Sequence, residues 1–207
     1  MNLFLTGTDT DVGKTYVAGL LVRALRRAGR NTAPMKPFCC GDRDDALALY
    51  AACDGAVPLD VINPIWYPTP ASPYAASKVE NRPVDLAPVH AAFQQLRARH
   101  KSLIVEGVGG WMVPIAKDYY VADLAAEFAL PVAVVVRNRL GALNHALLTV
   151  RDIKARGIPF AGIIFNRTAT DNDCAAATNR ALLEELMGEP ILFEIRPGQR
   201  ELELPVG

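Results

Sequence analysis

The residues best suited to chemistry lie near the start of the chain, where residues 7–15 read GTDTDVGKT. In a nucleotide-binding loop, backbone N–H groups and a helix N-terminus face the phosphates, a lysine neutralises their charge, and a threonine hydroxyl can ligate Mg²⁺. Lys14 and Thr15 supply the last two groups. The pattern therefore predicts a nucleoside triphosphate site made by Asp9, Thr10, Asp11, Val12, Gly13, Lys14 and Thr15.

This loop departs from the usual phosphate-loop spacing, because Gly7 stands one position too far upstream and Thr8 occupies its place. A plainer interpretation is a polar helix start with Thr10 or Asp11 as the cap. The position of the loop, directly after the apolar run Leu3-Phe4-Leu5, favours the nucleotide site.

Two further groups of interest end predicted strands. Lys36 ends the strand 32–36, and Glu106 ends the apolar strand 103–106, before a glycine-rich turn that includes Gly109. Open α/β sheets bind ligands at these strand ends. A second lysine there can hold a γ-phosphate or a carboxylate-like nucleophile, and an acid can organise a metal. The plainer alternatives are a solvated lysine and an exposed glutamate at a sharp turn.

Helix starts supply the remaining candidates. Asp44 and Asp45 open a short predicted helix, where they could either stabilise the helix N-terminus or hold Mg²⁺. The segment 140–145, LGALNH, opens another helix after the strand 132–136. Its free backbone N–H groups could receive an anionic substrate tail. We assign His145 no catalytic role.

Around these groups, short apolar runs alternate with segments of helical period, which predicts βα units on a mostly parallel sheet flanked by helices, as in phosphate-loop NTPases. The later predicted strands are 160–165, followed by Asn166, and 191–195. The predicted helices are 14–28, 44–53, 89–99, 121–128, 143–156 and 171–187. Seven prolines exclude a long element between Pro58 and Pro88, where 72–79 could form a short helix.

Composition limits the functional class. The 207 residues are 51% hydrophobic, which suits one α/β domain over residues 1–207. Lysine plus arginine and aspartate plus glutamate both number 22, without a basic stripe, so we expect no nucleic-acid partner. No stretch approaches the roughly 20 apolar residues that span a bilayer, so we expect a cytoplasmic protein without a membrane partner. We expect reduced thiols at Cys39, Cys40, Cys53 and Cys174.

Seven short strings of this sequence resemble motifs of the dethiobiotin synthetase family, and they occur in the same order as in that family. They are residues 7–15, Lys36-Pro37, DALAL at 45–49, Asn63-Pro64, Ser72-Pro73, VEGVGGW at 105–111 and LGALNHA at 140–146. The resemblance implies an ATP-dependent ligase of biotin biosynthesis, which closes a ureido ring from 7,8-diaminononanoate and CO₂ and releases dethiobiotin, ADP and phosphate.

The resemblance also implies residue roles. Lys14 binds the β- and γ-phosphates, Lys36 binds the carbamate and the transferred phosphate, and Thr10 completes the catalytic set. Thr15, Asp45 and Glu106 hold Mg²⁺. Thr10, Asp11, Lys36 and Cys40 lie near the substrate, Gly109 and Asn166 contact the nucleotide, and Asn166 meets the adenine. In a homodimer, Gly141, Ala142, Leu143 and Asn144 receive the carboxylate of a substrate held mainly by the other subunit.

Partitioning-type ATPase switches of the same superfamily, which act through protein partners, are the main alternative. They carry a signature lysine in the phosphate loop where this chain has Asp9, and that difference favours the synthetase. Two departures from the family pattern leave details open. Cys40 stands where a bacterial member has a serine, and the loop 41–45 is several residues shorter, which leaves the diamine contacts open. Pro197 is displaced by one residue, so ATP is favoured over other triphosphates on the resemblance alone.

Overall fold

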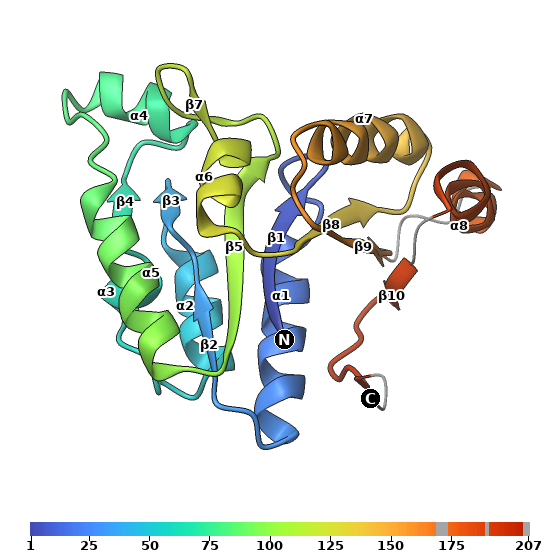
Figure 1. Ribbon diagram of the computed structural model, residues 1–207, viewed down its shortest axis with the longest axis horizontal. Coiled ribbons are helices and arrows are strands. Elements are labelled where there is room, and N and C mark those ends of the chain that lie inside the picture. The colour runs from blue at the N-terminus through green and yellow to red at the C-terminus, as the bar shows by residue number, and fades with distance from the viewer. Residues whose placement is uncertain (169–173, 189–190, 205–207) are drawn as a thin grey trace.

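A twisted sheet of six parallel strands forms the centre of the computed structural model, which describes residues 1–168, 174–188 and 191–204 (Figure 1). Its order is β10-β9-β8-β1-β5-β2, and every neighbouring pair is parallel. The strands are β1 (Asn2–Gly7), β2 (Thr32–Met35), β5 (Ser102–Gly110), β8 (Val132–Arg137), β9 (Phe160–Asn166) and β10 (Ile191–Ile195). The predicted mostly parallel α/β architecture is confirmed.

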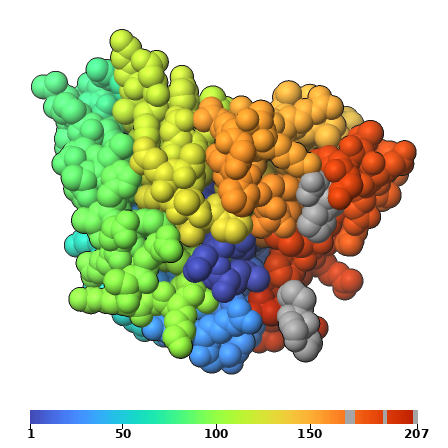
Figure 2. Space-filling model, in the orientation of Figure 1, coloured from blue at the N-terminus to red at the C-terminus, as the bar shows by residue number. Residues whose placement is uncertain are grey.

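Helices cover both faces of this sheet. They are α1 (Lys14–Arg27), α2 (Asp44–Ala52), α5 (Ala87–Arg99), α6 (Val121–Phe128), α7 (Ala142–Ala155) and α8 (Cys174–Met187). In Figure 1, α1 and α2 lie behind the strands, whereas α5 and α6 lie in front. The space-filling view shows α5, α6 and α7 covering the front face (Figure 2). Phe93 of α5 stacks on Phe128 of α6 at 3.8 Å, and Phe128 meets the edge of Phe4 in β1.

The central position of β1 explains where ligands can bind. The chain leaves β1 through α1 toward β2 on one side, while the strand on the other side of β1 is β8, which follows much later. Parallel sheets place ligands outside the carboxyl ends of the strands at such a switch point. The carboxyl-terminal parts of β1, β2 and β5 therefore meet at one edge. The loop 8–13 follows β1, Lys36 follows β2, and Glu106 lies within β5 beside Leu5 of β1.

The proline-rich region is more ordered than its composition predicts. It contains α3 (Leu59–Ile62), β4 (Ile65–Tyr67) and α4 (Pro73–Val79), and Ser72 caps α4 by accepting a bond from the Ala75 N–H. The strand β4 pairs in parallel with β3 (Phe38–Cys40). Neither strand was predicted from the sequence, because β3 and β4 depend on pairing between residues 27 positions apart, such as Phe38 and Ile65, rather than on local preference.

Several predicted boundaries also shift. The strand that holds Glu106 continues to Gly110, because Gly110 pairs with Gly7 of β1. The strand β2 ends at Met35, so Lys36 follows it directly. A small antiparallel pair, β6 (Pro114–Ala116) and β7 (Tyr119–Tyr120), was not predicted. The first three residues of the predicted helix 171–187 lie outside the described residues, and the rest is helical. In the described chain, no helix is long and apolar enough to cross a bilayer.

Candidate active site

The turn between β1 and α1 has the conformation that a phosphate loop requires. Gly13 precedes α1 with a φ of 88°, in the left-handed region that favours glycine. A Cβ at this position would lie 2.1 Å from Nδ2 of Asn166. No side chain caps α1, so the interpretation of Thr10 or Asp11 as a helix cap was wrong. The first backbone N–H groups of α1 remain available to an anion.

Two side chains hold this loop from within the protein. Nδ2 of Asn166 donates to the Val12 carbonyl at 2.9 Å, and Nζ of Lys14 donates to the Asp9 carbonyl at 2.9 Å. Asn166 and Val12 are both buried. Asp9 thus contacts Lys14 through its main chain, while its carboxylate accepts the Thr10 N–H at 2.8 Å. The contact of Asn166 with adenine stays a prediction; in this structure Asn166 shapes the loop.

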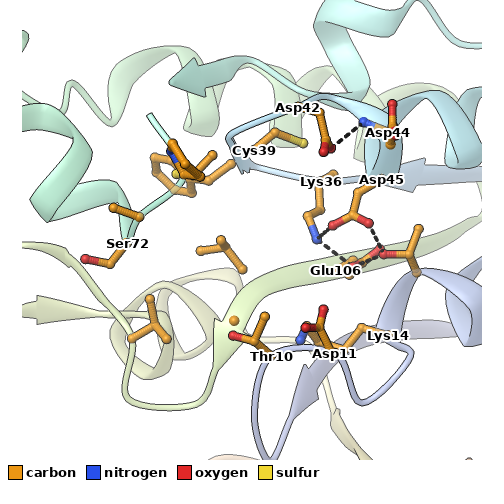
Figure 3. A pocket seen from close by; sticks show the side chains of 18 of the residues that line it. Thr10, Asp11, Lys14, Lys36, Cys39, Asp42, Asp44, Asp45, Ser72 and Glu106 are labelled. Carbon is orange, nitrogen blue, oxygen red and sulfur yellow. Dashed lines mark hydrogen bonds and ion pairs between the residues drawn. The ribbon is translucent and has the colours of Figure 1, made fainter. Parts of the chain in front are cut away.

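Next to the loop, Lys36 lies between two carboxylates. Its Nζ donates to Oδ2 of Asp45 and to Oε1 of Glu106, both at 2.6 Å, as Figure 3 shows. The side chain of Lys36 is 3% exposed and that of Glu106 is fully buried. We call Lys36, Asp45 and Glu106 the ionic cluster. The sequence predicted these residues separately, and the fold brings them together.

Thr15 connects the loop to this cluster. Its hydroxyl lies 2.7 Å from Oδ1 of Asp45 and 2.7 Å from Oε1 of Glu106. One hydroxyl carries a single hydrogen, so only one of these contacts can be donated by Thr15. In addition, Oε2 of Glu106 is buried without a hydrogen-bond partner. The cluster also has two carboxylates against one ammonium, which leaves an excess of negative charge.

These features suit a hard divalent cation. Mg²⁺ prefers one or two carboxylates together with hydroxyl, phosphate or water oxygens. A cation beside Thr15 would separate the Thr15 hydroxyl oxygen from the carboxylate oxygen to which it cannot donate a hydrogen. It would also give Oε2 of Glu106 a partner and neutralise the excess negative charge of the ionic cluster. No group of three or more histidine, cysteine or acidic side chains suited to a metal occurs in the part of the chain that the structure describes. A metal here therefore needs the Thr15 hydroxyl and ligands from a bound substrate.

The two lysines of the site have opposite pKa shifts. Burial, assisted by the nearby charge of Lys36, lowers the pKa of Lys14 to about 8. Burial also disfavours the charged form of Lys36, but the attraction of Glu106 and Asp45 outweighs burial and raises the pKa of Lys36 above its ordinary value. The same attraction by Lys36 holds the pKa of Asp45 below its ordinary value against the effect of burial. All three groups are charged at neutral pH.

The loop and the ionic cluster line one side of a cleft of about 930 Å³. Residues 38–40 and 70–72 also line this cleft, and we call them its far wall, because Figure 3 shows Cys39 and Ser72 across from Thr10, Asp11 and Lys14. The predicted site residues that border the cleft are Thr10, Asp11, Gly13, Lys14, Thr15, Lys36, Cys40, Asp45, Glu106 and Gly109. A left-handed φ of 59° at Gly109 lets the chain turn along its wall. Phosphates, metal and a small substrate can therefore meet in one space.

Some predicted residues lie elsewhere. The α7 start, Gly141 to Asn144, does not border this cleft. Asp9 lines a smaller hollow of about 420 Å³ together with Trp111, Met112, His145 and Leu148. The structure thus separates the α7 start from the cleft within one copy of the chain, and the role of residues 141–144 in a homodimer stays a prediction.

The sequence did not point to several other residues that border the cleft. Cys39, Asp42, Pro70, Ala71, Val108 and Val113 also border the cleft. Burial raises the pKa of the Cys39 thiol to about 11 and that of Cys40 to about 12, so both thiols are protonated at neutral pH. The Ser72-Pro73 string, which resembles a motif of the dethiobiotin synthetase family, was the one sequence signal for the wall at residues 70–72. The four cysteines are free thiols, as predicted.

Comparison with known proteins agrees with this geometry. A family model described as an AAA domain matches residues 1–203. The chain is 46% identical over 205 residues to the ATP-dependent dethiobiotin synthetase BioD of Akkermansia muciniphila, covering 99% of this chain and 96% of that protein. It is 47% identical over 172 residues to the enzyme of the same name from Aromatoleum aromaticum, covering 79% and 76% of the two chains.

Solved structures show the fold at greater distance. The Aquifex aeolicus MinC:MinD cell division complex matches with a TM-score of 0.58 at 14% identity, over 96% of this chain and 82% of that one. A ParA family ATPase from Chlorobium tepidum matches with a TM-score of 0.57 at 17% identity, over 96% and 85%. At such identities, the likeness concerns the arrangement of the sheet and helices alone.

Proposed function

The chain belongs to the family of ATP-dependent dethiobiotin synthetases, and from this premise we propose how its cleft performs the reaction. The enzyme is an ATP-dependent ligase that forms dethiobiotin in biotin biosynthesis. We propose 7,8-diaminononanoate and CO₂ as the substrates and ADP and phosphate as the other products. The observation that supports this assignment most directly is the contact of Lys36 with Asp45 and Glu106, beside Lys14 and Thr15 of the phosphate loop.

ATP binding follows from the loop. The N–H groups at the start of α1 face a bound polyphosphate, and Lys14 adds a positive charge against the β- and γ-phosphates. Among the described residues, the Asp9 carbonyl is the one hydrogen-bond partner of Nζ of Lys14, so the lysine can exchange this contact for phosphate oxygens. Asn166 fixes Val12 and contributes to the shape of the loop, and we propose that its side chain also borders the adenine.

The ring closure needs no protein nucleophile. One substrate amine captures CO₂ as a carbamate, and a carbamate oxygen attacks the γ-phosphate, which releases ADP. The second amine then attacks the carbamic-phosphoric anhydride, closes the ureido ring and expels phosphate. Lys36 faces the carbamate and the transferred phosphoryl group, and Thr10 and Asp11 orient the diamine. Phosphoryl transfer asks mainly for positioning and charge stabilisation, which these side chains supply.

We propose that Thr15, Asp45 and Glu106 hold Mg²⁺. Held there, the ion would offset the negative charge that develops on the phosphate oxygens. The unpartnered Glu106 oxygen and the excess negative charge of the ionic cluster support this role. Chelation of the metal should therefore abolish turnover and leave the helical content unchanged, as measured by circular dichroism.

We further propose a homodimer in the cytoplasm, where ATP is supplied. The α7 start is separate from the cleft in its own chain, and the exposed apolar residues Met112 and Leu148 border the neighbouring hollow. A second copy can cover these residues and bring its α7 N–H groups to the substrate carboxylate. The exposed α7 start would otherwise face solvent without a ligand.

A mixing experiment tests this dimer. Asn144→Glu places a negative charge where the substrate carboxylate would bind, and it should raise the KM for the diamine, whereas Asn144→Gln should not. Mixed with Lys14→Ala protein under conditions that exchange subunits, Asn144→Glu should recover about a quarter of the wild-type activity, because each mixed dimer has one intact cleft. Absence of recovery despite proven subunit exchange would contradict the shared site.

The main function has a direct assay. Protein mixed with 7,8-diaminononanoate, bicarbonate and MgATP should yield dethiobiotin by mass spectrometry, with one ADP for each product molecule. ATP hydrolysis without dethiobiotin, and with no dependence on the diamine, would instead indicate a partitioning-type switch. The presence of Asp9 in the loop, where such switches carry their signature lysine, supports the synthetase.

A further inference from the structure

A buried asparagine, Asn63, connects the main chain of Lys36 with the start of the helix that carries Asp45. Asn63 is 2% exposed and lies between α3 and β4, in the segment that follows the first proline of the irregular region. Its Nδ2 donates to the carbonyls of Lys36 and Ile65, both at 2.9 Å. Its Oδ1 accepts from Nε of Arg43 at 3.0 Å. Every polar atom of this side chain therefore has a partner.

The main chain of Lys36 is held from both sides by this segment. The Lys36 N–H donates to the Ile62 carbonyl at 2.7 Å, and the Lys36 carbonyl accepts from Asn63 at 2.9 Å. Lys36 lies between the end of β2 and the start of β3, one residue beyond Met35, the last residue of β2 in register with β5. The contacts with residues 62 and 63 thus fix the backbone from which the lysine side chain extends.

The other end of the connection is Arg43, which immediately precedes α2. Its guanidinium donates to Oδ1 and to the carbonyl of Asn63, and to Oδ1 of Asp60 at 3.0 Å. It also lies 5.6 Å from the ring centroid of Trp66. Asp45 stands two residues later in the first turn of α2. A shift of Arg43 would therefore shift the carboxylate that Lys36 contacts.

These contacts form a closed ring. Lys36 contacts Asp45 through its side chain, Asp45 follows Arg43 in the chain, Arg43 holds Asn63, and Asn63 holds the main chain of Lys36. Figure 3 shows the side chains of Lys36 and Asp45 pointing toward each other. Figure 1 shows β3 and β4 side by side at the same end of the molecule. We call Arg43 and Asn63 the bridge.

We propose that Asn63 and Arg43 are positioning residues that set the placement of Lys36 against Asp45. The inference rests on the roles proposed above for Lys36 and Asp45. Neither bridge residue borders the cleft, so they act through the residues they hold. Small displacements of a reacting group can lower a rate by about 100-fold, and transfer of a phosphoryl group depends chiefly on such placement.

The residue types fit this task better than a purely structural one. An apolar residue at position 63 would fill the same volume but would leave the carbonyl of Lys36 and the Nε of Arg43 without partners. A lysine at position 43 would keep a charge but not the planar fork that holds both oxygens of Asn63. The bridge therefore needs an amide and a guanidinium.

The test compares four variants in steady-state kinetics. In Asn63→Ala we expect kcat to fall at least about tenfold, while the KM for ATP changes by less than about threefold. Arg43→Met should show the same split, and Arg43→Lys should recover part of kcat, because it keeps one donor. The double variant Arg43→Met, Asn63→Ala should be no worse than Asn63→Ala, since both changes open the same ring.

Arg82→Met is the matched control. Arg82 donates to the Trp66 carbonyl and lies 4.0 Å from the Tyr67 ring centroid, so it supports β4 without touching Lys36, Arg43 or Asn63. We expect its kcat to stay within about twofold of wild type. An equal loss of kcat in Arg82→Met, or a loss in Asn63→Ala carried by the KM for ATP alone, would overturn the inference.

A second measurement does not depend on turnover. Amide hydrogen exchange across residues 36–45 should be faster in Asn63→Ala and Arg43→Met than in wild type, and unchanged in Arg82→Met. Unchanged exchange in the bridge variants would overturn the inference. If wild-type protein formed no dethiobiotin, the proposed function would fail, and the exchange experiment would still decide whether the bridge holds the two segments.

Discussion

The phosphate loop and the ionic cluster both carry a buried lysine, but the protein holds the two lysines in opposite ways. Lys14 donates to the Asp9 carbonyl, and in the described chain no carboxylate lies within ion-pair distance of it. Lys36 contacts two carboxylates. Burial lowers the pKa of Lys14 to about 8, whereas the carboxylates raise the pKa of Lys36.

These opposite contacts and pKa shifts indicate that the charges of Lys14 and Lys36 are balanced differently before substrate binds. Among the described residues, Lys14 has no direct ion pair, and Glu106, Asp45 and Asp11 attract its charge only from a greater distance. Bound phosphates can therefore provide its direct partner. The charge of Lys36 is compensated internally, so its position is set in advance and its contacts must rearrange as a metal and substrate bind. The same substitution, removal of an amine, should therefore affect stability differently at the two sites.

The largest expected effect comes from Lys14→Ala. Loss of the only loop lysine should lower kcat by at least about 10³-fold, as expected for a cation that offsets charge in phosphoryl transfer. The variant should remain folded by circular dichroism. Steady-state kinetics measures the loss, and Lys101→Ala, an exposed lysine at the opposite end of β5, is the control. An unchanged kcat in Lys14→Ala would contradict the role of Lys14 in phosphoryl transfer.

The stability of Lys14→Ala sharpens the comparison. The folded-state pKa of Lys14 lies below the ordinary lysine value, so folding disfavours its protonated form, and this penalty is fully present below about pH 8. At pH 7 the Tm of Lys14→Ala in the absence of nucleotide should therefore equal or exceed that of wild type. A clear decrease in Tm would mean that Lys14 is a structural residue.

The second prediction concerns Lys36→Met. The variant leaves Asp45 and Glu106 without their cation, so we expect a loss of about 3 kcal/mol in the free energy of unfolding. It should lower kcat far more than it weakens ATP binding, because the lysine contacts the transferred group chiefly in the transition state. Calorimetry with ADP and steady-state kinetics separate the two effects. Equal losses would indicate a plain binding lysine.

A double variant tests whether the cluster acts as a unit. In Lys36→Met, Glu106→Gln, the uncompensated buried carboxylate is removed as well, so the double variant should be more stable than Lys36→Met alone. Additive destabilisation in chemical unfolding would show that Lys36 and Glu106 do not interact in solution.

The same contrast explains what the sequence could predict. The loop is continuous from Gly7 to Thr15, so its residue types and position directly indicate a phosphate site. Lys36 and Glu106 were identified because they follow or lie near the carboxyl ends of predicted strands, where open parallel sheets bind ligands. The centre of the sheet was predictable because β1, β8 and the first part of β5 are apolar runs buried on both faces.

The bridge and the far wall could not be predicted in this way. The strands β3 and β4 have three residues each, too few to give a periodic signal, and they form only by pairing with each other. Asn63 appeared in a string that resembled the family, but its role depends on hydrogen bonds to residues 20 and 27 positions away. Such contacts follow from tertiary structure rather than from local spacing.

The third prediction tests the loop conformation through two glycines. Gly29 has a φ of 74° with open space around it, so Gly29→Ala should cost about 1 kcal/mol from backbone strain alone. Gly13→Ala adds a collision with Asn166 to a similar strain. It should destabilise the protein further and weaken ATP binding about tenfold, as loss of aligned N–H donors implies. Titration calorimetry and thermal unfolding measure both effects. Equal behaviour of the two variants would show that Asn166 does not support the loop.

The smallest effect is expected at the far wall of the cleft, at two neighbouring cysteines. Cys40 is partly exposed to the cleft, so Cys40→Ser replaces one small polar group by another and should change the KM for the diamine by less than about threefold.

The neighbouring Cys39 is 3% exposed, and a buried hydroxyl without a partner costs about 1–3 kcal/mol. Cys39→Ser should therefore lower the Tm while Cys40→Ser leaves it unchanged. A large rise in the KM of Cys40→Ser would place this thiol in direct contact with the diamine, and it would make the far wall as decisive for the reaction as the ionic cluster opposite.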